Sequence, residues 1–282
     1  MRRFVLFAAV LAGAGAVAVE TFFRVEYGLA TPPLYAAHPT IEYIAKPDQD
    51  VRIFGNHQVY NSLSMRSPPL SSVQEDRTVL VFGDSVLNGG TALDQADLAT
   101  SLATARSRSD GRPTFFGNVS AKSWGPANII GWIEEHGFLD ADTAIFVLSS
   151  HDYYDLPTFE PLDPTVHPTE RPLLALNYVL SRVMSRVLPS GAAQASPPPT
   201  EEDVRRGERE VAGLIDRAAE AGLKVCLIQH MTKSELSAAP DLGHAEIKRV
   251  FASRGVPIQN LGTALSAKID QASDPFIDDI HI

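Results

Sequence analysis

The chain has 282 residues, of which 44% are hydrophobic and 21% are charged, and its formal net charge is −10. This composition is ordinary for a globular protein and excludes wholesale disorder. The pI near 5.2 argues against a nucleic-acid partner, because binding to phosphate needs a basic face. The length is sufficient for one large domain with extensions.

Residues 1–19 have the pattern of a signal peptide or a membrane anchor. Two arginines precede an uncharged run from Phe4 to Val19, and small residues between Ala14 and Ala18 are spaced for cleavage. Such a run forms a helix of roughly 24 Å, shorter than the ~30 Å hydrocarbon core of a bilayer. This favours a cleaved signal, whereas Phe22 and Phe23 could lengthen the run into a membrane-tethering anchor. Both alternatives predict an exported protein, periplasmic or otherwise extracytoplasmic.

Residues 20–76 predict a small β-rich N-terminal extension. Short pieces with alternating polarity occur at Val51 to Phe54 and His57 to Tyr60, among scattered Pro, Asn and Tyr. We expect hairpins here and no long helix.

Residues 77–282 predict the main domain. Apolar runs alternate with longer helical segments, which is typical of βαβ units around a parallel sheet. The predicted strands are Thr78–Phe82, Thr114–Val119, Thr143–Leu148, Lys224–Gln229 and Val256–Asn260. The predicted helices are Leu93–Ala105, Ala127–His136, Glu201–Ala221, His244–Ser253 and Thr263–Gln271. The fold class is therefore α/β, with a five-stranded parallel sheet in a three-layer α/β/α arrangement.

An insertion, residues 153–199, separates the third and fourth predicted strands. It holds a Pro-rich part, an amphipathic piece from Leu173 to Leu188 and a flexible stretch, Gly191 to Pro199. Because it leaves the sheet at the carboxyl edge, where α/β folds bind ligands, it could form a lid or a substrate rim. The alternative is that its apolar residues pack against the body; they are Leu173, Leu176, Leu180 and Met184.

A candidate nucleophile follows the first predicted strand. The apolar run Val79 to Phe82 leads into Gly83, Asp84 and Ser85, so the serine would stand at the carboxyl edge of the sheet. Near the far end, Asp278 and His281 are three residues apart, a spacing that places a general base and its orienting acid on one short turn. These residues predict a serine esterase or acyltransferase.

Gly83-Asp84-Ser85-Val86 and Asp278-Asp279-Ile280-His281 resemble the nucleophile and acid-base blocks of the SGNH or GDSL hydrolase superfamily. The resemblance extends roughly from Thr78 to the C-terminus and implies the flavodoxin-like SGNH fold. It also implies a triad in which Ser85 attacks an ester carbonyl, His281 takes its proton and Asp278 orients the imidazole. The N–H of Ser85 would be one oxyanion donor.

Two further blocks of the family are altered in this chain. The second carries an oxyanion glycine, and the matching stretch from Asn118 to Gly125 puts Ser123 at that position, or Gly125 if the register is shifted. The third is GxND, and here His151 stands where the family has its Asn. An imidazole N–H can donate to an oxyanion, with a strength that depends on its protonation.

The extension resembles the leader of exported SGNH proteins that are associated with bacterial surface polysaccharides, in the stretches Tyr35 to Tyr43 and Asn61 to Ser67. This implies a carbohydrate or small acyl-ester substrate, with O-acetyl groups that are removed or transferred. We expect Trp124, Tyr153 and Tyr154 to face sugar, and Trp132 to lie in the core.

The altered blocks leave a second function open. With Ser123 and His151 in the oxyanion positions, the chain could instead be a non-catalytic glycan-binding or polysaccharide-assembly protein. No cofactor and no metal are expected, because the remaining histidines lack ligand spacing and no nucleotide-binding loop occurs. Cys226, the only cysteine, lies in an apolar run and is expected to be a small core residue. The oligomeric state is left open.

Overall fold

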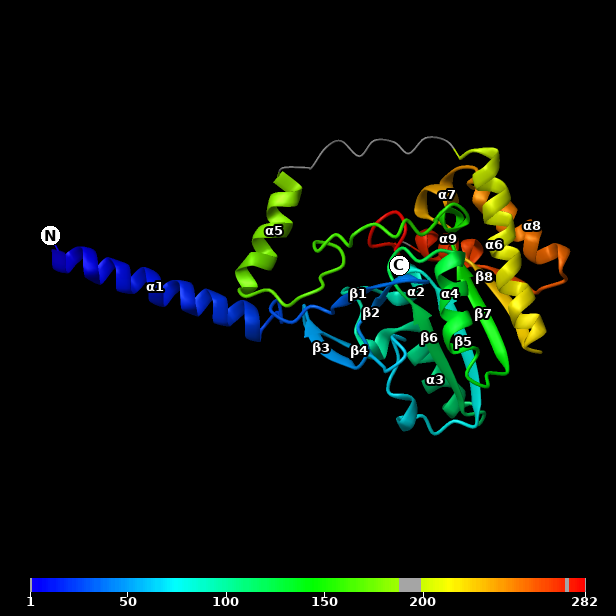
Figure 1. Ribbon diagram of the computed structural model, residues 1–282, viewed down its shortest axis with the longest axis horizontal. Helices are drawn as coiled ribbons and strands as arrows, with labels where there is room; N and C mark the ends of the chain where they lie inside the picture. Colours follow the sequence, from blue (N-terminus) through cyan, green and yellow to red (C-terminus); the bar gives the residue numbers. More distant parts are fainter. Residues whose placement is uncertain (1, 188–198, 272–273, 282) are drawn as a thin grey trace.

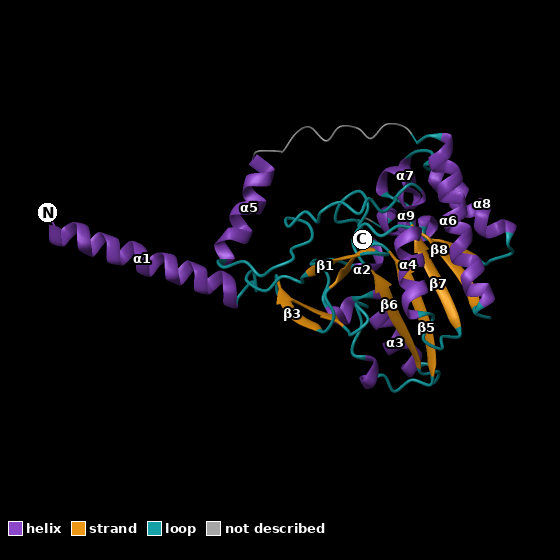
Figure 2. Ribbon diagram, in the orientation of Figure 1, coloured by secondary structure: helices purple, strands orange, loops and turns teal. Residues whose placement is uncertain are grey.

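The computed structural model describes residues 2–187, 199–271 and 274–281 (Figure 1). Helix α1 (Arg2–Val25) projects from the rest of the molecule, and two β hairpins follow it (Figure 2). The body is a parallel sheet between two layers of helices. This three-layer α/β/α architecture is the one that the sequence predicts.

The sheet contains all five predicted strands, in the order β6-β5-β7-β8-β9, and all of its neighbouring strands are parallel. This order, with the first strand second from one edge, is the flavodoxin-like arrangement. The strands are β5 (Arg77–Gly83), β6 (Thr114–Ser120), β7 (Thr143–Leu148), β8 (Lys224–Gln229) and β9 (Ile258–Asn260). Cys226 is half-buried in β8, and burial raises the pKa of its thiol.

Both faces of the sheet are covered, because alternate residues of each central strand point to opposite sides. In β5, Leu80 and Phe82 pack with Phe146 of β7 beneath three helices of one layer. Val79 and Val81 join a separate cluster on the other face. The first layer consists of α4 (Pro126–His136), α6 (Glu201–Glu220) and α8 (Leu242–Ser253). Truncating a buried Phe such as Phe82 to alanine typically costs about 3–5 kcal/mol, so this face contributes much of the stability.

The remaining helices of the domain are α2 (Ser85–Asn88), α3 (Ala99–Ser109), α7 (Lys233–Ser237) and α9 (Gly262–Asp270). Four of the five predicted helices are confirmed within two residues at each end. The start predicted at Leu93 is wrong, because the Asp94 carboxylate accepts a bond from the N–H of Ala96 at 3.0 Å and caps a separate 3₁₀ turn there. Helix α3 therefore begins six residues later than predicted, at Ala99.

The expected hairpins are present in the extension as β1 (Tyr35–His38) with β2 (Glu42–Ala45) and β3 (Gln49–Ile53) with β4 (Asn56–Tyr60). However, residues 20–25 belong to α1, so the boundary predicted after residue 19 falls inside a helix. Glu20 is accommodated because it pairs with Arg24 one turn later. The chain turns only at Gly28, where φ is +65° and an added Cβ would lie 1.8 Å from the carbonyl oxygen of Arg52.

The extension is part of the same core as the sheet. Tyr35, Tyr60 and Met65 are buried in the cluster that contains Phe82. Fully buried Arg66 donates to the carbonyl oxygens of the loop after α2, including that of Leu93 at 2.8 Å. The extension thus helps to fix the end of α2 and the loop that follows it.

In the insertion, α5 (Ala175–Val187) lies beside α1 and away from the sheet (Figure 1). The predicted packing of its apolar residues on the body is wrong for Leu173, Leu180 and Met184, which are exposed. Residues 191–198 of the predicted flexible stretch lie outside the described residues.

Candidate active site

Ser85, His281 and Asp278 come together at the carboxyl edge of the sheet. The Ser85 hydroxyl lies 2.9 Å from Nε2 of His281, and Nδ1 of His281 lies 2.8 Å from Oδ2 of Asp278. With the ring proton on Nδ1, the imidazole donates to Asp278 and accepts from Ser85. This is the tautomer that a general base needs, and the geometry is that of a serine-hydrolase triad.

Asp278 is held as a carboxylate by its own turn. The backbone N–H of His281 and that of Ile280 each donate to its Oδ1 at 2.8 Å. The bond from the backbone N–H of His281 lowers the pKa of Asp278 most. With the bonds from the His281 ring and from the N–H of Ile280, it brings this pKa to about 2. The group that orients the imidazole is therefore ionised throughout the neutral range.

The loop that carries His281 is anchored to the region after β8. Nε2 of buried His230 donates to the carbonyl oxygen of Ile280 at 2.8 Å. The Asp279 carboxylate accepts from both the N–H and the hydroxyl of Ser234, each at 2.8 Å. The N–H of Lys233 donates to the carbonyl of Asp279 at 2.7 Å. These bonds fix the position of His281.

Ser85, the candidate nucleophile, stands at the start of the short helix α2. Asp84, which is buried, caps α2 by accepting from the N–H of Val86 at 2.9 Å. At the other end of α2, the side-chain amide of Asn88 donates to the carbonyl of Ser120 at 3.0 Å and ties the turn to β6. Ser85 is consequently presented from a turn that is held at both ends.

The two candidates for the second oxyanion position, Ser123 and Gly125, differ in their surroundings. The N–H of Gly125 donates to Oδ1 of Asn128 at 2.9 Å, and an added Cβ on Gly125 would lie 2.2 Å from the carbonyl oxygen of Asp155. Gly125 thus has a packing and capping role. Ser123 is exposed and has a φ of +55°, a conformation that favours the family's glycine. This geometry favours Ser123 as the position that matches the oxyanion glycine.

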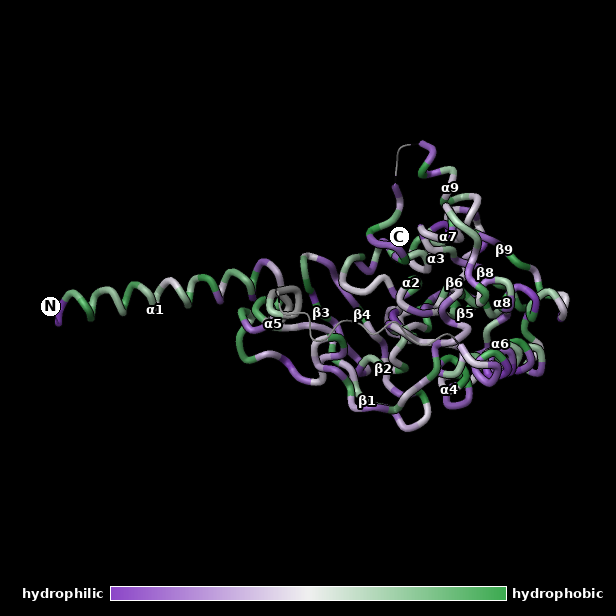
Figure 3. Tube along the Cα trace, turned by 90° about the horizontal axis from the view of Figure 1, so that it is seen from above, coloured by the Kyte–Doolittle hydropathy of each residue, from purple (hydrophilic) through white to green (hydrophobic). Residues whose placement is uncertain are grey.

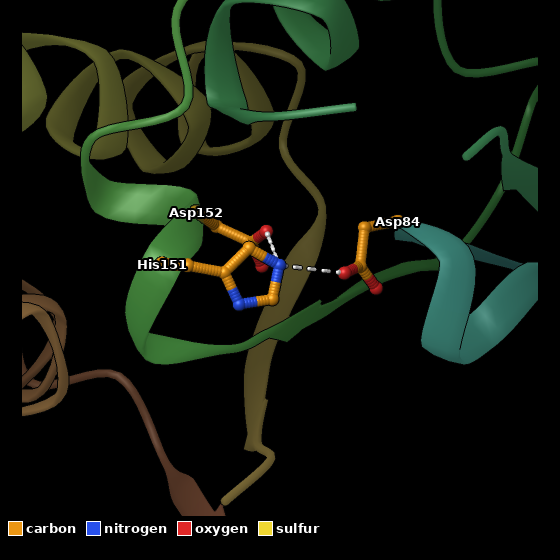
Figure 4. A group of neighbouring side chains, drawn as sticks. All are labelled: Asp84, His151 and Asp152. Atoms are coloured by element: carbon orange, nitrogen blue, oxygen red, sulfur yellow. Dashed lines mark ion pairs between the residues drawn. The ribbon is translucent and has the colours of Figure 1, made fainter. Parts of the chain in front are cut away.

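His151 lies between two buried carboxylates. Its Nε2 is 3.3 Å from Oδ2 of Asp84 and 3.3 Å from Oδ1 of Asp152. The second ring nitrogen points away from both (Figure 4). Since Asp84 directly precedes Ser85, the imidazole of His151 is attached to the strand end that carries the nucleophile.

The charges around His151 decide its protonation. Burial alone lowers the pKa of His151, but the bond to Asp84 and the negative charges of Asp152, Asp84 and Asp155 outweigh it and raise the pKa to about 9. Burial raises the pKa of Asp152 well above its usual range. Burial, opposed by His151 and helped by Asp84 and Glu42, raises the pKa of Asp155 to about 6. At neutral pH His151 is therefore an imidazolium with both nitrogens as donors.

Asp84, His151 and Asp152 also carry the donor atoms of a divalent-cation site, and these atoms lie within 4.8 Å of one another. The same spacing is that of a protonated imidazole shared by two carboxylates. In this second arrangement the imidazolium itself is the cation.

The aromatic residues expected to face sugar lie elsewhere. Trp124 is buried and its indole N–H donates to the carbonyl of Tyr43 at 3.0 Å, while the hydroxyl of buried Tyr153 donates to the carbonyl of Val204 at 2.9 Å. The sugar-stacking prediction is wrong for both. Tyr154 is half-buried against Tyr153, and Trp132 is in the core as predicted.

Sequence reasoning missed three residues that support the site. Asp155 lies in a loop, where no regular pattern marks it. Its spacing of three residues from Asp152 is the one signal that the sequence offers. Asp279 lies inside the DxxH block, and the sequence alone assigns it no role. His230 follows directly on β8, at the same sheet edge as the other site residues, and that position is the signal that could have identified it.

A scan of protein-family models and a search of curated proteins found no match to the chain. Among solved structures, it is similar to AlinE4, an SGNH-hydrolase family esterase, with 16% identity, coverage of 74% of this chain and 88% of that one, and a TM-score of 0.42. The acetyl xylan esterase AlAXEase matches with 13% identity, coverage of 73% and 91%, and a TM-score of 0.44. The psychrotrophic esterase EstA from Pseudoalteromonas sp. matches with 11% identity, coverage of 73% and 87%, and a TM-score of 0.43. The superfamily that the sequence blocks resemble is thus represented among the similar structures.

Proposed function

We propose that this protein is an exported SGNH-type serine esterase or acyltransferase that acts on O-acetyl groups of a carbohydrate. The observation that carries the proposal is the unbroken chain of hydrogen bonds from Ser85 through His281 to Asp278. Three residues from opposite ends of the domain converge in the order that nucleophilic catalysis requires. A protein that only binds glycan has no need of this arrangement, and the triad therefore favours the enzyme over the binding protein.

In the first half-reaction, Oγ of Ser85 attacks the acetyl carbonyl carbon while its proton passes to Nε2 of His281. Asp278 stabilises the resulting imidazolium through Nδ1. The tetrahedral intermediate collapses when the bond to the alcohol oxygen breaks, and His281 gives its proton to that oxygen. The sugar hydroxyl leaves and an acetyl group remains on Ser85.

In the second half-reaction, an incoming hydroxyl attacks the acetyl-serine and His281 takes its proton. If the hydroxyl belongs to water, the product is acetate. If it belongs to a sugar, the acetyl group is transferred. The intermediate on Ser85 is the same in both cases.

The oxyanion donors that we propose are the N–H of Ser85, the N–H of Ser123 and the nitrogen of His151 that points away from Asp84 and Asp152. As an imidazolium, His151 adds a positive charge to a site where negative charge develops. His151 would thus take the role of the family's Asn with a charged donor in place of a neutral amide.

The carbohydrate and the export are supported by sequence. The stretches Tyr35 to Tyr43 and Asn61 to Ser67 resemble leaders of exported polysaccharide-associated SGNH proteins. Helix α1 is long and apolar enough to cross a membrane, a property that it shares with signal sequences. We propose that α1 tethers the domain on the outer side of the cytoplasmic membrane.

The proposed function is tested with an O-acetylated polysaccharide, with xylan acetate as the probe. The full-length protein is expected to release acetate, and in the presence of a sugar acceptor to move acetyl groups to it, because either hydroxyl can resolve the acyl intermediate. Acetate and acetyl-sugar are measured by chromatography. Glycan binding without any turnover, of xylan acetate or of p-nitrophenyl acetate, would support the binding protein instead.

The charge of His151 predicts an alkaline limit to activity. Since the pKa of His151 is raised to about 9, its imidazolium is present below that pH and is lost above it. We expect kcat for p-nitrophenyl acetate, corrected for hydrolysis by buffer, to fall as the pH rises through about 9. The fall should reach about 10²-fold, the lower end of what an oxyanion donor contributes.

His151→Asn is the matched variant for this prediction, because an amide donates independently of pH in this range. In this variant the alkaline decline should disappear while Ser85-dependent activity remains. If the parent and the variant decline in parallel, His151 is not an oxyanion donor.

A further inference from the structure

Helix α5 carries an apolar face that is largely exposed in the part of the chain that the structure describes. We call Leu173, Leu176, Leu180 and Met184 the α5 apolar face. Leu173 lies two residues before the helix, and the spacing of the other three places them along one side of it. Leu173 is 88% exposed, and Leu180 and Met184 are each 50% exposed. Leu176 is half-buried. A group of exposed large apolar side chains on one side of a helix indicates a contact with something apolar.

The opposite side of α5 is the one that packs on the protein. Ala175, Tyr178 and Val179 join the small cluster that contains Leu29 and Ile53. The helix therefore has a fixed orientation on the body. This packing turns the α5 apolar face away from the body.

The start of α5 is attached to the C-terminal end of α1. The Glu20 carboxylate accepts from the N–H groups of Ala175 at 2.8 Å and Leu176 at 3.1 Å, so a residue of α1 caps α5. Arg24 pairs with Glu20 and also donates to the carbonyl of Leu173. The direction of α5 is consequently fixed relative to α1.

The two helices run crosswise. Figure 1 shows α5 rising away from the line of α1, and Figure 3, turned from that view, shows α5 nearly end on beside the end of α1. Helix α1 has 24 residues and an apolar surface along most of its length, and such a helix reaches about 36 Å, enough to cross a bilayer. If α1 stands across the membrane, α5 lies along its surface.

Aromatic side chains gather where α1 ends. The rings of Phe22 and Tyr27 meet edge to face at 5.6 Å, and the ring of Phe54 lies 6.1 Å from that of Tyr178 on α5. Phe22, Tyr27 and Phe54 are all exposed. Exposed aromatic residues at the end of an apolar helix are typical of the boundary between lipid and water.

We propose that α5 is an interfacial helix, which lies on the outer surface of the membrane that α1 spans and inserts its apolar face among the lipid headgroups. The inference rests on the membrane tether included in the proposed function and not on the ester chemistry. Together, α1 and α5 would hold the catalytic domain at two points and so fix its orientation to the membrane.

The test uses the full-length chain reconstituted in vesicles of phosphatidylcholine and phosphatidylglycerol. In a Cys226→Ala background, single cysteines Leu180→Cys and Leu242→Cys are labelled with an environment-sensitive fluorophore. Leu242 is the matched control, a leucine that is 53% exposed and belongs to α8, a helix at the opposite end of the molecule from α1 (Figure 1). With doxyl-labelled lipid in the vesicles, we expect about a twofold loss of emission at position 180 and almost none at position 242.

Quenching that is absent at position 180, or equal at the two positions, would overturn the proposal. A third label, Val10→Cys in α1, should be quenched most strongly, and its failure would also overturn the proposal because the tether would not be inserted.

The double variant Leu180→Glu with Met184→Glu separates this proposal from the enzymatic one. Position 10 should stay quenched while a label at position 173 loses its quenching, and turnover of p-nitrophenyl acetate should be unchanged. Quenching at position 173 that survives the double variant would contradict the proposal. Conversely, absence of Ser85-dependent turnover with normal quenching at position 180 would contradict the proposed enzyme and leave the interfacial helix standing.

Discussion

Replacing Ser85 by alanine is expected to lower kcat for an acetyl ester by about 10⁴-fold or more, because the variant has no nucleophile to accept the acyl group. The hydroxyl lies 2.9 Å from Nε2 of His281. Its removal leaves the proposed oxyanion donors in place, so a small residual rate over water should remain. The rate is measured with p-nitrophenyl acetate at pH 8 or below, where His151 remains largely protonated.

Ser237→Ala is the control for this substitution. Ser237 is exposed, and its hydroxyl donates to carbonyl oxygens of its own short helix α7. The kcat of the Ser237→Ala variant should stay close to that of the parent protein. An Ser85→Ala protein that keeps more than about a tenth of the parent rate would contradict a role for Ser85 as nucleophile.

The second large effect is expected for Asp278→Asn, which should lower kcat by about 10⁴-fold with little change in fold. The carboxylate now accepts the proton on Nδ1 of His281 at 2.8 Å. An amide nitrogen in its place would donate to Nδ1 and move the ring proton to Nε2. In that tautomer the imidazole cannot accept the proton of Ser85.

Asp279→Asn provides the comparison at the neighbouring residue. Its carboxylate bonds to Ser234 and does not contact the His281 ring, so the effect should be within about 10-fold, the range of a positioning contact. Thermal unfolding of both variants checks that the fold is kept. Equal losses in the two variants would mean that Asp278 has no special part in orienting His281.

The strands of the sheet and the three residues of the triad could be predicted from the sequence, because each is marked by a pattern of a few neighbouring residues. Each strand is a short apolar run between helical segments, and Ser85 follows such a run directly. Asp278 and His281 share one turn, so their spacing alone places them together. The order of the strands then brings the two blocks to the same edge, as parallel strands require.

The surroundings of His151 could not be predicted in this way. Its protonation depends on Asp84, Asp152 and Asp155, which come from different elements or from an irregular loop, and on how deeply they are buried. A pattern read along the chain carries no information about these distances. Nor could the sequence predict the environment of Trp124, whose indole N–H donates to a backbone carbonyl inside the core and does not face a sugar.

The α5 apolar face was visible in the sequence as spacing, but spacing does not say what covers a face. The sequence left open a lid or substrate rim and packing on the body, and the second alternative requires that the apolar side turns toward the protein. The capping of α5 by Glu20 and the packing of Ala175 direct the α5 apolar face outward. Contacts between segments about 150 residues apart therefore decided the orientation.

Mass spectrometry of the acyl-enzyme tests the central claim most directly. The full-length protein is mixed with p-nitrophenyl acetate, quenched in acid and digested. We predict one acetyl group on the peptide that contains Ser85, which is absent in Ser85→Ala and forms far more slowly in His281→Ala. An unmodified Ser85 in the folded, full-length protein, or an acetyl group carried by a different residue during turnover, would contradict the account.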